Sequence, residues 1–144
     1  MSELLKEYYK LQYDRIAQHE GRRMQFSNLA IVTSSAVITI GIRLDCGQAF
    51  GVSIVIAVLL IAINVAAILF IDKSRQWIKF HQLRAKKILE KYDQDLNEIV
   101  ESVEKADSSK DPLSLINIQK YLHMSLLGLA VLYPVVIYLI CRKP

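Results

Sequence analysis

Residues 50–71 read FGVSIVIAVLLIAINVAAILFI, and no charged side chain interrupts them. The charge-free run that contains this stretch extends from Cys46 to Ile71 and is 26 residues long. About 20 mainly apolar residues in a helix cross the roughly 30 Å hydrocarbon core of a bilayer, and helices buried in soluble domains rarely match that length. The stretch therefore predicts a membrane-spanning helix.

Two further runs repeat the pattern, 19 residues from Met24 to Ile42 and 21 residues from Tyr121 to Cys141. Hydroxyl residues dilute the first run, but a helix in a membrane tolerates them because a hydroxyl bonds the carbonyl one turn earlier. The third run contains Pro134, which predicts a kink rather than an end. Arg142 and Lys143 follow it and run against the bias of cations toward the cytoplasm, so a re-entrant or interfacial segment is the alternative to a full span. We therefore expect an all-α integral membrane protein with spans at residues 25–43, 50–71 and 122–141.

The distribution of lysine and arginine predicts the orientation of these spans. Five cations precede the first span, the loop that follows it holds only Arg43, and six more cations follow the second span within residues 73–87. Cytoplasmic flanks of membrane helices carry the excess of Lys and Arg. We expect a multi-pass protein of the bacterial inner membrane, with its N-terminus and residues 72–121 in the cytoplasm.

Two polar segments complete the predicted organisation. Residues 1–24 form an amphipathic cytoplasmic helix, and residues 72–121 form a helical region, so that together they make a small cytoplasmic bundle. No Gly or Pro lies between Asp72 and Ala106. The second span is therefore predicted to continue as one helix of about 57 residues, about 85 Å long at 1.5 Å per residue.

A heptad pattern marks the far part of that helix. Its apolar positions recur at alternating intervals of three and four, which is the spacing of a seam between packed helices; they are Leu89, Tyr92, Leu96, Ile99, Val103 and Ala106. The partner of the seam is either the N-terminal helix of the same chain or another subunit. The pattern leaves this choice open.

A basic cluster lies between the second span and the seam. It comprises Lys73, Arg75, Lys79, Arg84, Lys86 and Lys87, with Trp77 and Phe80 among them. Cations next to a membrane attract anionic lipid head groups at about 1 kcal/mol each, and aromatic rings prefer the interface. We expect lipid to be the partner of this cluster. Nucleic acid is not an expected partner, because no nucleic-acid-binding signature accompanies the cations.

Asn64 is the one amide deep in the second span. A polar side chain in hydrocarbon needs a partner, so it either bonds another helix or lines a polar path through the membrane. Ala62 and Ala66 beside it form a small-residue stripe that indicates close helix packing.

The sequence offers little catalytic chemistry. The histidines have no metal-ligand spacing, and we expect neither a metal nor a cofactor. Arg75 and His81 resemble the R-x4-6-H signature of HEPN ribonucleases, whose pair acts at the scissile phosphate. Six residues along a helix turn by about 240°, so the two side chains converge only with a partner subunit or a broken helix. We expect no enzyme activity, with Arg75 and His81 as the candidates if that is wrong.

The two cysteines of the chain, Cys46 and Cys141, fall at the outer ends of the second and third spans in the predicted topology. A disulfide between them needs Cα atoms within about 7 Å. We treat the pair as a candidate disulfide.

A polar helix ending in HEGRRMQFSN, residues 19–28, then two close spans and a long charged helix form an arrangement that resembles small bacterial anti-phage membrane effectors. The nearest groups are the SLATT proteins and the membrane accessory proteins of RNA-targeting CRISPR systems. The resemblance covers residues 1–106 and rests on architecture, and the third span departs from the two-span SLATT plan. It implies an oligomer that perforates or depolarises the inner membrane when infection is sensed.

The leading hypothesis is therefore a homo-oligomeric, pore-type membrane effector. Two alternatives remain, a non-conducting adaptor that docks a soluble defence protein through its cytoplasmic helices and a membrane-tethered HEPN-like ribonuclease.

Overall fold

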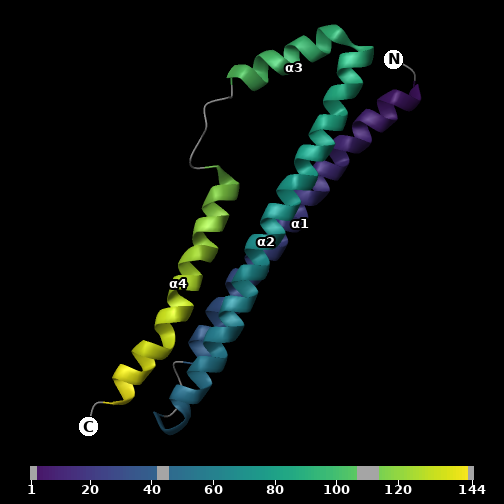
Figure 1. Cartoon of the computed structure of the whole chain (residues 1–144). Helices are drawn as coiled ribbons and strands as arrows, with labels where there is room; N and C mark the ends of the chain where they lie inside the picture. The colour runs from purple at the N-terminus through teal and green to yellow at the C-terminus, as the bar shows by residue number, and fades with distance from the viewer. Residues whose placement is uncertain (1–2, 42–45, 107–113, 143–144) are drawn as a thin grey trace. The chain divides into compact units, whose positions relative to one another are not determined.

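The computed structural model describes residues 3–41, 46–106 and 114–142, without the side chains of residues 46–49 and 104–106. These residues form four helices and no strand: α1 (Glu3–Gly41), α2 (Cys46–Tyr92), α3 (Gln94–Ala106) and α4 (Leu115–Cys141) (Figure 1). Three of them, α1, α2 and α4, are long and apolar enough to cross a membrane. The prediction of an all-helical chain with three candidate spans is confirmed.

The chain divides into two compact units, each described by itself. The polar unit comprises Met1–Arg23 and Asp72–Ser114, and the apolar unit comprises Met24–Ile71 and Leu115–Pro144. Two of the dividing points, after Arg23 and after Ile71, coincide with the ends of charge-free runs. The predicted segments 1–24 and 25–43 are thus parts of one helix, since α1 continues without a break from Glu3 to Gly41.

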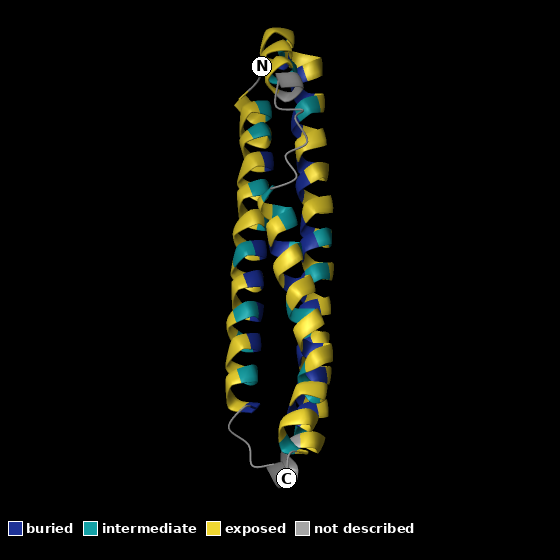
Figure 2. Cartoon of the chain, turned by 90° about the vertical axis from the view of Figure 1, so that its left-hand side faces the viewer, coloured by how far each residue is buried: buried dark blue, intermediate teal, exposed yellow. Residues whose placement is uncertain are grey.

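In the apolar unit, most apolar side chains point outward. At most a third of the most apolar window of each candidate span is buried within the chain, and Figure 2 shows burial confined to one side of each long helix. The small apolar core consists of Ile56, Leu60 and Ala130. Exposed leucine, isoleucine and valine on this scale require lipid or other subunits to cover them.

In the polar unit, α1 packs against the part of α2 that follows Ile71. The buried positions of α2 recur at intervals of three and four; they are Ser74, Ile78, His81, Ala85 and Ile88, with Leu89 beside them. Two bonds join the helices, from Ser74 Oγ to the carbonyl oxygen of His19 and between His81 Nδ1 and Gln12 Oε1. The contact between α1 and α2 therefore uses serine, alanine and histidine positions that the predicted seam did not include.

The prediction of one helix from Phe50 to Ala106 is wrong. The long helix ends at Tyr92, and Asp93 begins a new one, because its carboxylate Oδ1 accepts the backbone N–H of Leu96 at 3.2 Å. Aspartate is a favoured N-cap residue, since its side chain satisfies an N–H that has no carbonyl partner in the first turn. The break divides the predicted seam: Leu89 is buried, whereas Tyr92, Leu96, Ile99 and Val103 are exposed.

Candidate functional site

A chain of polar side chains lies buried at the centre of the apolar unit and joins all three of its helices. Ser27 and Ser34 come from α1, Asn64 from α2 and His123 from α4, and none is more than 1% exposed. His123 Nε2 lies 2.9 Å from Ser27 Oγ, and His123 Nδ1 lies 2.8 Å from Asn64 Oδ1. The amide Nδ2 of Asn64 donates to Ser34 Oγ at 3.0 Å. We call these four residues the polar network.

The bonds of Asn64 determine the proton positions in the polar network. Its Nδ2 also donates to the carbonyl oxygen of Leu60 at 2.8 Å, and a carbonyl can only accept. The amide oxygen therefore faces His123, so that Nδ1 of the imidazole must carry the hydrogen. A neutral His123 then accepts at Nε2, and Ser27 Oγ donates to it.

This arrangement makes the polar network the specific link between the three helices. The apolar core of the unit is small, whereas a buried polar group without a partner costs about 1–3 kcal/mol. The bonds therefore select one register of α1, α2 and α4, because a slip of any helix leaves at least one group unpaired. In a membrane-spanning segment, an ionisable residue is also a candidate functional group.

The order serine, histidine, asparagine has the connectivity of a nucleophile, a base and an orienting group. Ser27 nevertheless lies inside α1, where backbone N–H groups bond carbonyls four residues earlier and are not free to stabilise an oxyanion. It is also only 1% exposed, so a substrate has no access to its hydroxyl. Among the described residues, no three His, Cys, Asp or Glu side chains gather as a metal site. The geometry therefore supports a hydrogen-bonded relay rather than acyl transfer.

Asn64 was identifiable from sequence, but its partners were not. His123 lies in an apolar run at the start of the third span, and Ser27 and Ser34 occur among other hydroxyl residues. The one available signal is the seven-residue spacing of Ser27 and Ser34, which places them on one face of α1. Which helix faces that side is a tertiary property.

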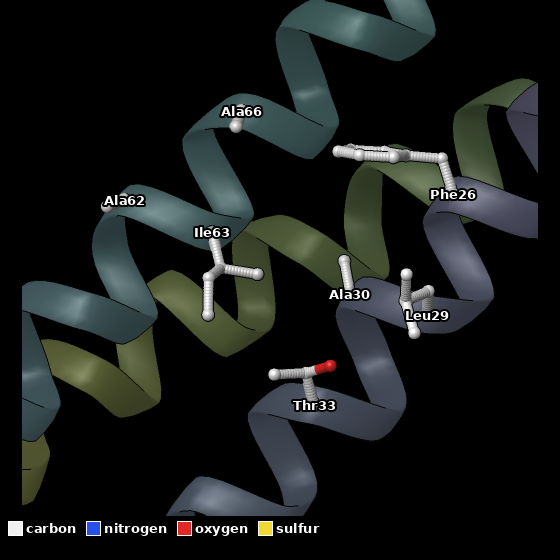
Figure 3. A pocket seen from close by; sticks show the side chains of 7 residues that line it. All are labelled: Phe26, Leu29, Ala30, Thr33, Ala62, Ile63 and Ala66. Atoms are coloured by element: carbon white, nitrogen blue, oxygen red, sulfur yellow. The ribbon is translucent and has the colours of Figure 1, made fainter.

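Ala62 and Ala66 do not lie in a tight helix contact within the chain. They line an apolar groove of about 410 Å³ between α1 and α2, to which α1 contributes Phe26, Leu29, Ala30 and Thr33 (Figure 3). The groove is on the outside of the apolar unit, away from Asn64, which is fully buried. The predicted close packing at these alanines is therefore not met inside one chain.

The basic cluster is on the surface of the polar unit. Five of its members are exposed, and Lys86 is half-buried and pairs with Glu101 of α3 at 3.3 Å. Arg84 lies over the Phe80 ring at 4.1 Å and Lys73 over the Trp77 ring at 5.9 Å. The surface is thus both cationic and aromatic, which suits anionic head groups and also an acidic protein surface.

His81 lies in a cluster of rings in the polar unit. Its ring is 5.6 Å from that of His19 and 6.4 Å from that of Trp77, and His19 stacks on Trp77 at 6.0 Å. Burial, and then the positive charges of His19, Arg84 and Arg15, lower the pKa of His81 below its ordinary value. The folded unit therefore holds His81 neutral.

The lowered pKa of His81 predicts acid sensitivity of the polar unit. Above about pH 6.5 His81 is neutral in both the folded and the unfolded chain. As the pH falls below 6.5, the unfolded chain binds the proton more readily than the folded chain does. The free energy of unfolding therefore decreases until the pH has passed through the folded pKa. Trp77, the single tryptophan of the chain, reports the proton through its ring contacts. We expect its fluorescence to titrate with a midpoint below 6.5. His19→Gln should raise the midpoint, and a midpoint unchanged by that substitution would contradict the assignment.

Arg75 and His81 do not form a site within the chain. Arg75 is exposed on α2, whereas His81 is buried and bonded to Gln12 on α1. The helix is continuous between them, so the roughly 240° rotation expected from the spacing applies.

The two cysteines lie at helix ends in the apolar unit. Cys46 is the first residue of α2 and Cys141 the last residue of α4. One turn further along, Phe50 and Tyr138 are in edge-to-face contact with ring centroids 5.7 Å apart, so these ends of α2 and α4 are close. The Cys46 side chain lies outside the described residues, and the disulfide stays a prediction.

If Cys46 and Cys141 pair, the disulfide closes a covalent loop that contains most of the chain. The oxidised chain should then migrate faster on a non-reducing denaturing gel than the reduced chain does. Cys46→Ser and Cys141→Ser should each abolish the difference. Equal mobility of the wild-type chain with and without reductant would exclude the bond.

Comparisons with protein-family models, with curated proteins and with solved structures gave no match to this chain.

Proposed function

We propose that the protein is a homo-oligomeric effector that permeabilises or depolarises the bacterial inner membrane, in a role of the anti-phage type that the resemblance implies. The observation that carries the proposal is the polar network. Three helices with apolar outer surfaces enclose a histidine, an asparagine and two serines. An inert anchor needs no such interior, because apolar side chains would pack it without risk of an unpaired group.

The network suggests how such an effector works. In the isolated subunit its polar atoms satisfy one another, so the bundle offers no path for ions. In an assembly, rotation of one helix turns these groups toward a shared interior, where water replaces the lost bonds. The change is inexpensive because a wet polar group costs far less than one left in hydrocarbon.

The orientation with residues 72–121 in the cytoplasm is part of the proposal. The exposed cations of the basic cluster support it, since they suit the anionic cytoplasmic leaflet. In this orientation the polar unit is available to receive a cytoplasmic signal, and the apolar unit acts on the bilayer.

Membrane potential in bacterial cells tests the proposal. Induction of the wild-type chain should depolarise the cells within one generation, as reported by a potential-sensitive dye, and purified protein should release K⁺ from liposomes. Ser125→Ala should leave both readouts unchanged, because the Ser125 hydroxyl is exposed on α4 and, among the described residues, donates to the Tyr121 carbonyl alone. Unchanged potential at every expression level, with the protein present in the membrane, would exclude a permeabilising function.

One observation favours the adaptor as a second candidate. The apolar residues of α3 are exposed, so this helix offers a surface to another protein. An adaptor predicts that induction leaves the potential unchanged and that Ile99→Asp releases a specific soluble protein from the membrane. The ribonuclease alternative has no comparable observation in its favour.

A further inference from the structure

The helix α3 is amphipathic, and its apolar side faces away from the chain. Leu96, Ile99 and Val103 are 38%, 59% and 61% exposed, whereas Asn97 is 9% exposed. The Oδ1 atom of Asn97 is buried without a hydrogen-bond partner among the described residues. These three apolar residues follow a 3-4 spacing and form what we call the α3 stripe.

This orientation is unfavourable for a subunit on its own. It leaves apolar area in water and buries a polar atom without a bond, and both cost free energy. A cover for the α3 stripe removes the first cost.

A membrane surface is a poor cover for the α3 stripe. Asp95 is exposed at the edge of the stripe and Glu98 is exposed further around α3, and anionic lipid repels both. The cover should instead be a basic surface.

The chain itself carries such a surface on α2. Its members recur at intervals of four and three and comprise Lys73, Trp77, Phe80, Arg84, Lys87 and Lys91, all exposed. We call it the basic aromatic face. Lys73, Arg84 and Lys91 lie over Trp77, Phe80 and Tyr92 rings, and no described carboxylate pairs with them. It is apolar at its centre and cationic along its length, which complements the α3 stripe and its acids.

Within one chain the α3 stripe does not cover the basic aromatic face, since Leu96, Ile99 and Val103 are all exposed. The polar side of α3 is held to α2 by the ion pair between Glu101 and Lys86. Lys86 lies about 160° around the helix from Arg84 and about 100° from Lys87, so it is outside the basic aromatic face. The α3 of a subunit therefore contacts its own α2 beside this face and not on it.

We propose that the α3 stripe of one subunit docks on the basic aromatic face of a second copy of this chain. The contact joins two different surfaces, so each subunit donates one and accepts one, and such contacts close into a ring when the rotation allows. The inference rests on the self-association in the proposed function and adds the surfaces that produce it.

Cross-linking between two differently tagged copies in membranes tests the contact. Val103→Cys in one copy and Gln76→Cys in the other place thiols in the α3 stripe and beside the basic aromatic face, and a short bismaleimide joins them. We expect a band that carries both tags. When Gln94→Cys, on the opposite side of α3, is used in place of Val103→Cys, the cross-linked product should fall about fivefold. This is the ratio that a preference of 1 kcal/mol for contact through the α3 stripe gives. Each variant co-expressed with an unsubstituted copy gives the background from the native cysteines.

Charge exchange provides a second measurement that does not depend on a single variant folding well. Arg84→Glu in the accepting copy, or Asp95→Lys in the donating copy, should each weaken the band about fivefold, and the two together should restore it. A band whose intensity changes with neither charge substitution would overturn the proposal. A band that is stronger between two Val103→Cys copies than between a Val103→Cys copy and a Gln76→Cys copy would also overturn it.

The outcomes separate this inference from the proposed function. If the mixed band is absent while induction still depolarises cells, the docking contact is wrong and permeabilisation stands. If the band forms and the potential is unchanged, the contact stands and permeabilisation is wrong.

Discussion

Replacing Asn64 by leucine should destabilise the three-helix bundle by about 1–3 kcal/mol, because the substitution leaves the Nδ1–H of His123 buried without an acceptor. Leucine has the branching of asparagine at Cγ but a larger volume, so no cavity forms, and the loss reflects the lost hydrogen bonds together with any overpacking. His123→Leu should cost a similar amount, since it leaves Asn64 Oδ1 unpaired. Thermal unfolding of the purified protein in detergent, followed by circular dichroism, measures both.

The double variant distinguishes a hydrogen-bonded network from simple packing. With both residues changed to leucine, no amide or imidazole remains to be satisfied, and the hydroxyls of Ser27 and Ser34 can bond carbonyls of their own helix. The double variant should therefore be more stable than the sum of the single effects predicts, by about 1–2 kcal/mol of coupling. Additive losses would show that Asn64 and His123 act independently.

The same double variant separates function from stability. It retains the apolar surface and the three candidate spanning helices but lacks the amide and the imidazole of the polar network. We expect it to reach the membrane at the wild-type level and to lose depolarising activity, because a path through the bundle would present only apolar side chains. Full activity in a stable double variant would remove the polar network from the mechanism.

Gly41→Leu should destabilise the apolar unit by about 2–3 kcal/mol through overpacking. A Cβ on Gly41 would meet Ile56 Cδ1 at 2.6 Å and would collide with Tyr133 Oη. Ile56 belongs to the apolar core and Tyr133 packs against it, so neither side chain can move freely. The midpoint of thermal unfolding should fall correspondingly.

Gly128 provides the matched control, because a Cβ there has nothing within 4 Å. Gly128→Leu places an apolar side chain on the outside of α4 and replaces a poor helix former, so stability should be unchanged or raised by up to about 1 kcal/mol. A loss at Gly128 equal to that at Gly41 would mean that the packing around Gly41 is not the cause.

Most of the secondary structure was predictable because it depends on local properties. Three charge-free runs marked the candidate spans, since length and hydropathy are read directly from consecutive residues. The break at Asp93 was not predicted, although an aspartate before Leu96 was available as a cap signal. A sequence free of Gly and Pro permits a helix to continue but does not require it, and a single N-cap can end it.

Only one residue of the polar network, Asn64, was predictable from the sequence. Asn64 is conspicuous because an amide is costly in hydrocarbon, whereas serines and a histidine near the ends of apolar runs are common. The seam residues were correctly recognised as amphipathic, yet their exposure on α3 was not foreseen. The contact between α1 and α2 uses Ser74, Ala85 and His81, which a search for large apolar residues omits.

The sequence by itself determined which segments of the chain are stable in an apolar environment such as a membrane, since the free energy of burying each apolar run depends on composition and length alone. Only the tertiary structure decided that Ser27, His123, Asn64 and Ser34 form one network and that the apolar side of α3 faces outward. Hydrogen bonds act over about 3 Å and between defined atoms, so they depend on the rotation of each helix about its own axis. A sequence fixes the faces of a helix, but the neighbouring helices determine which face each one meets.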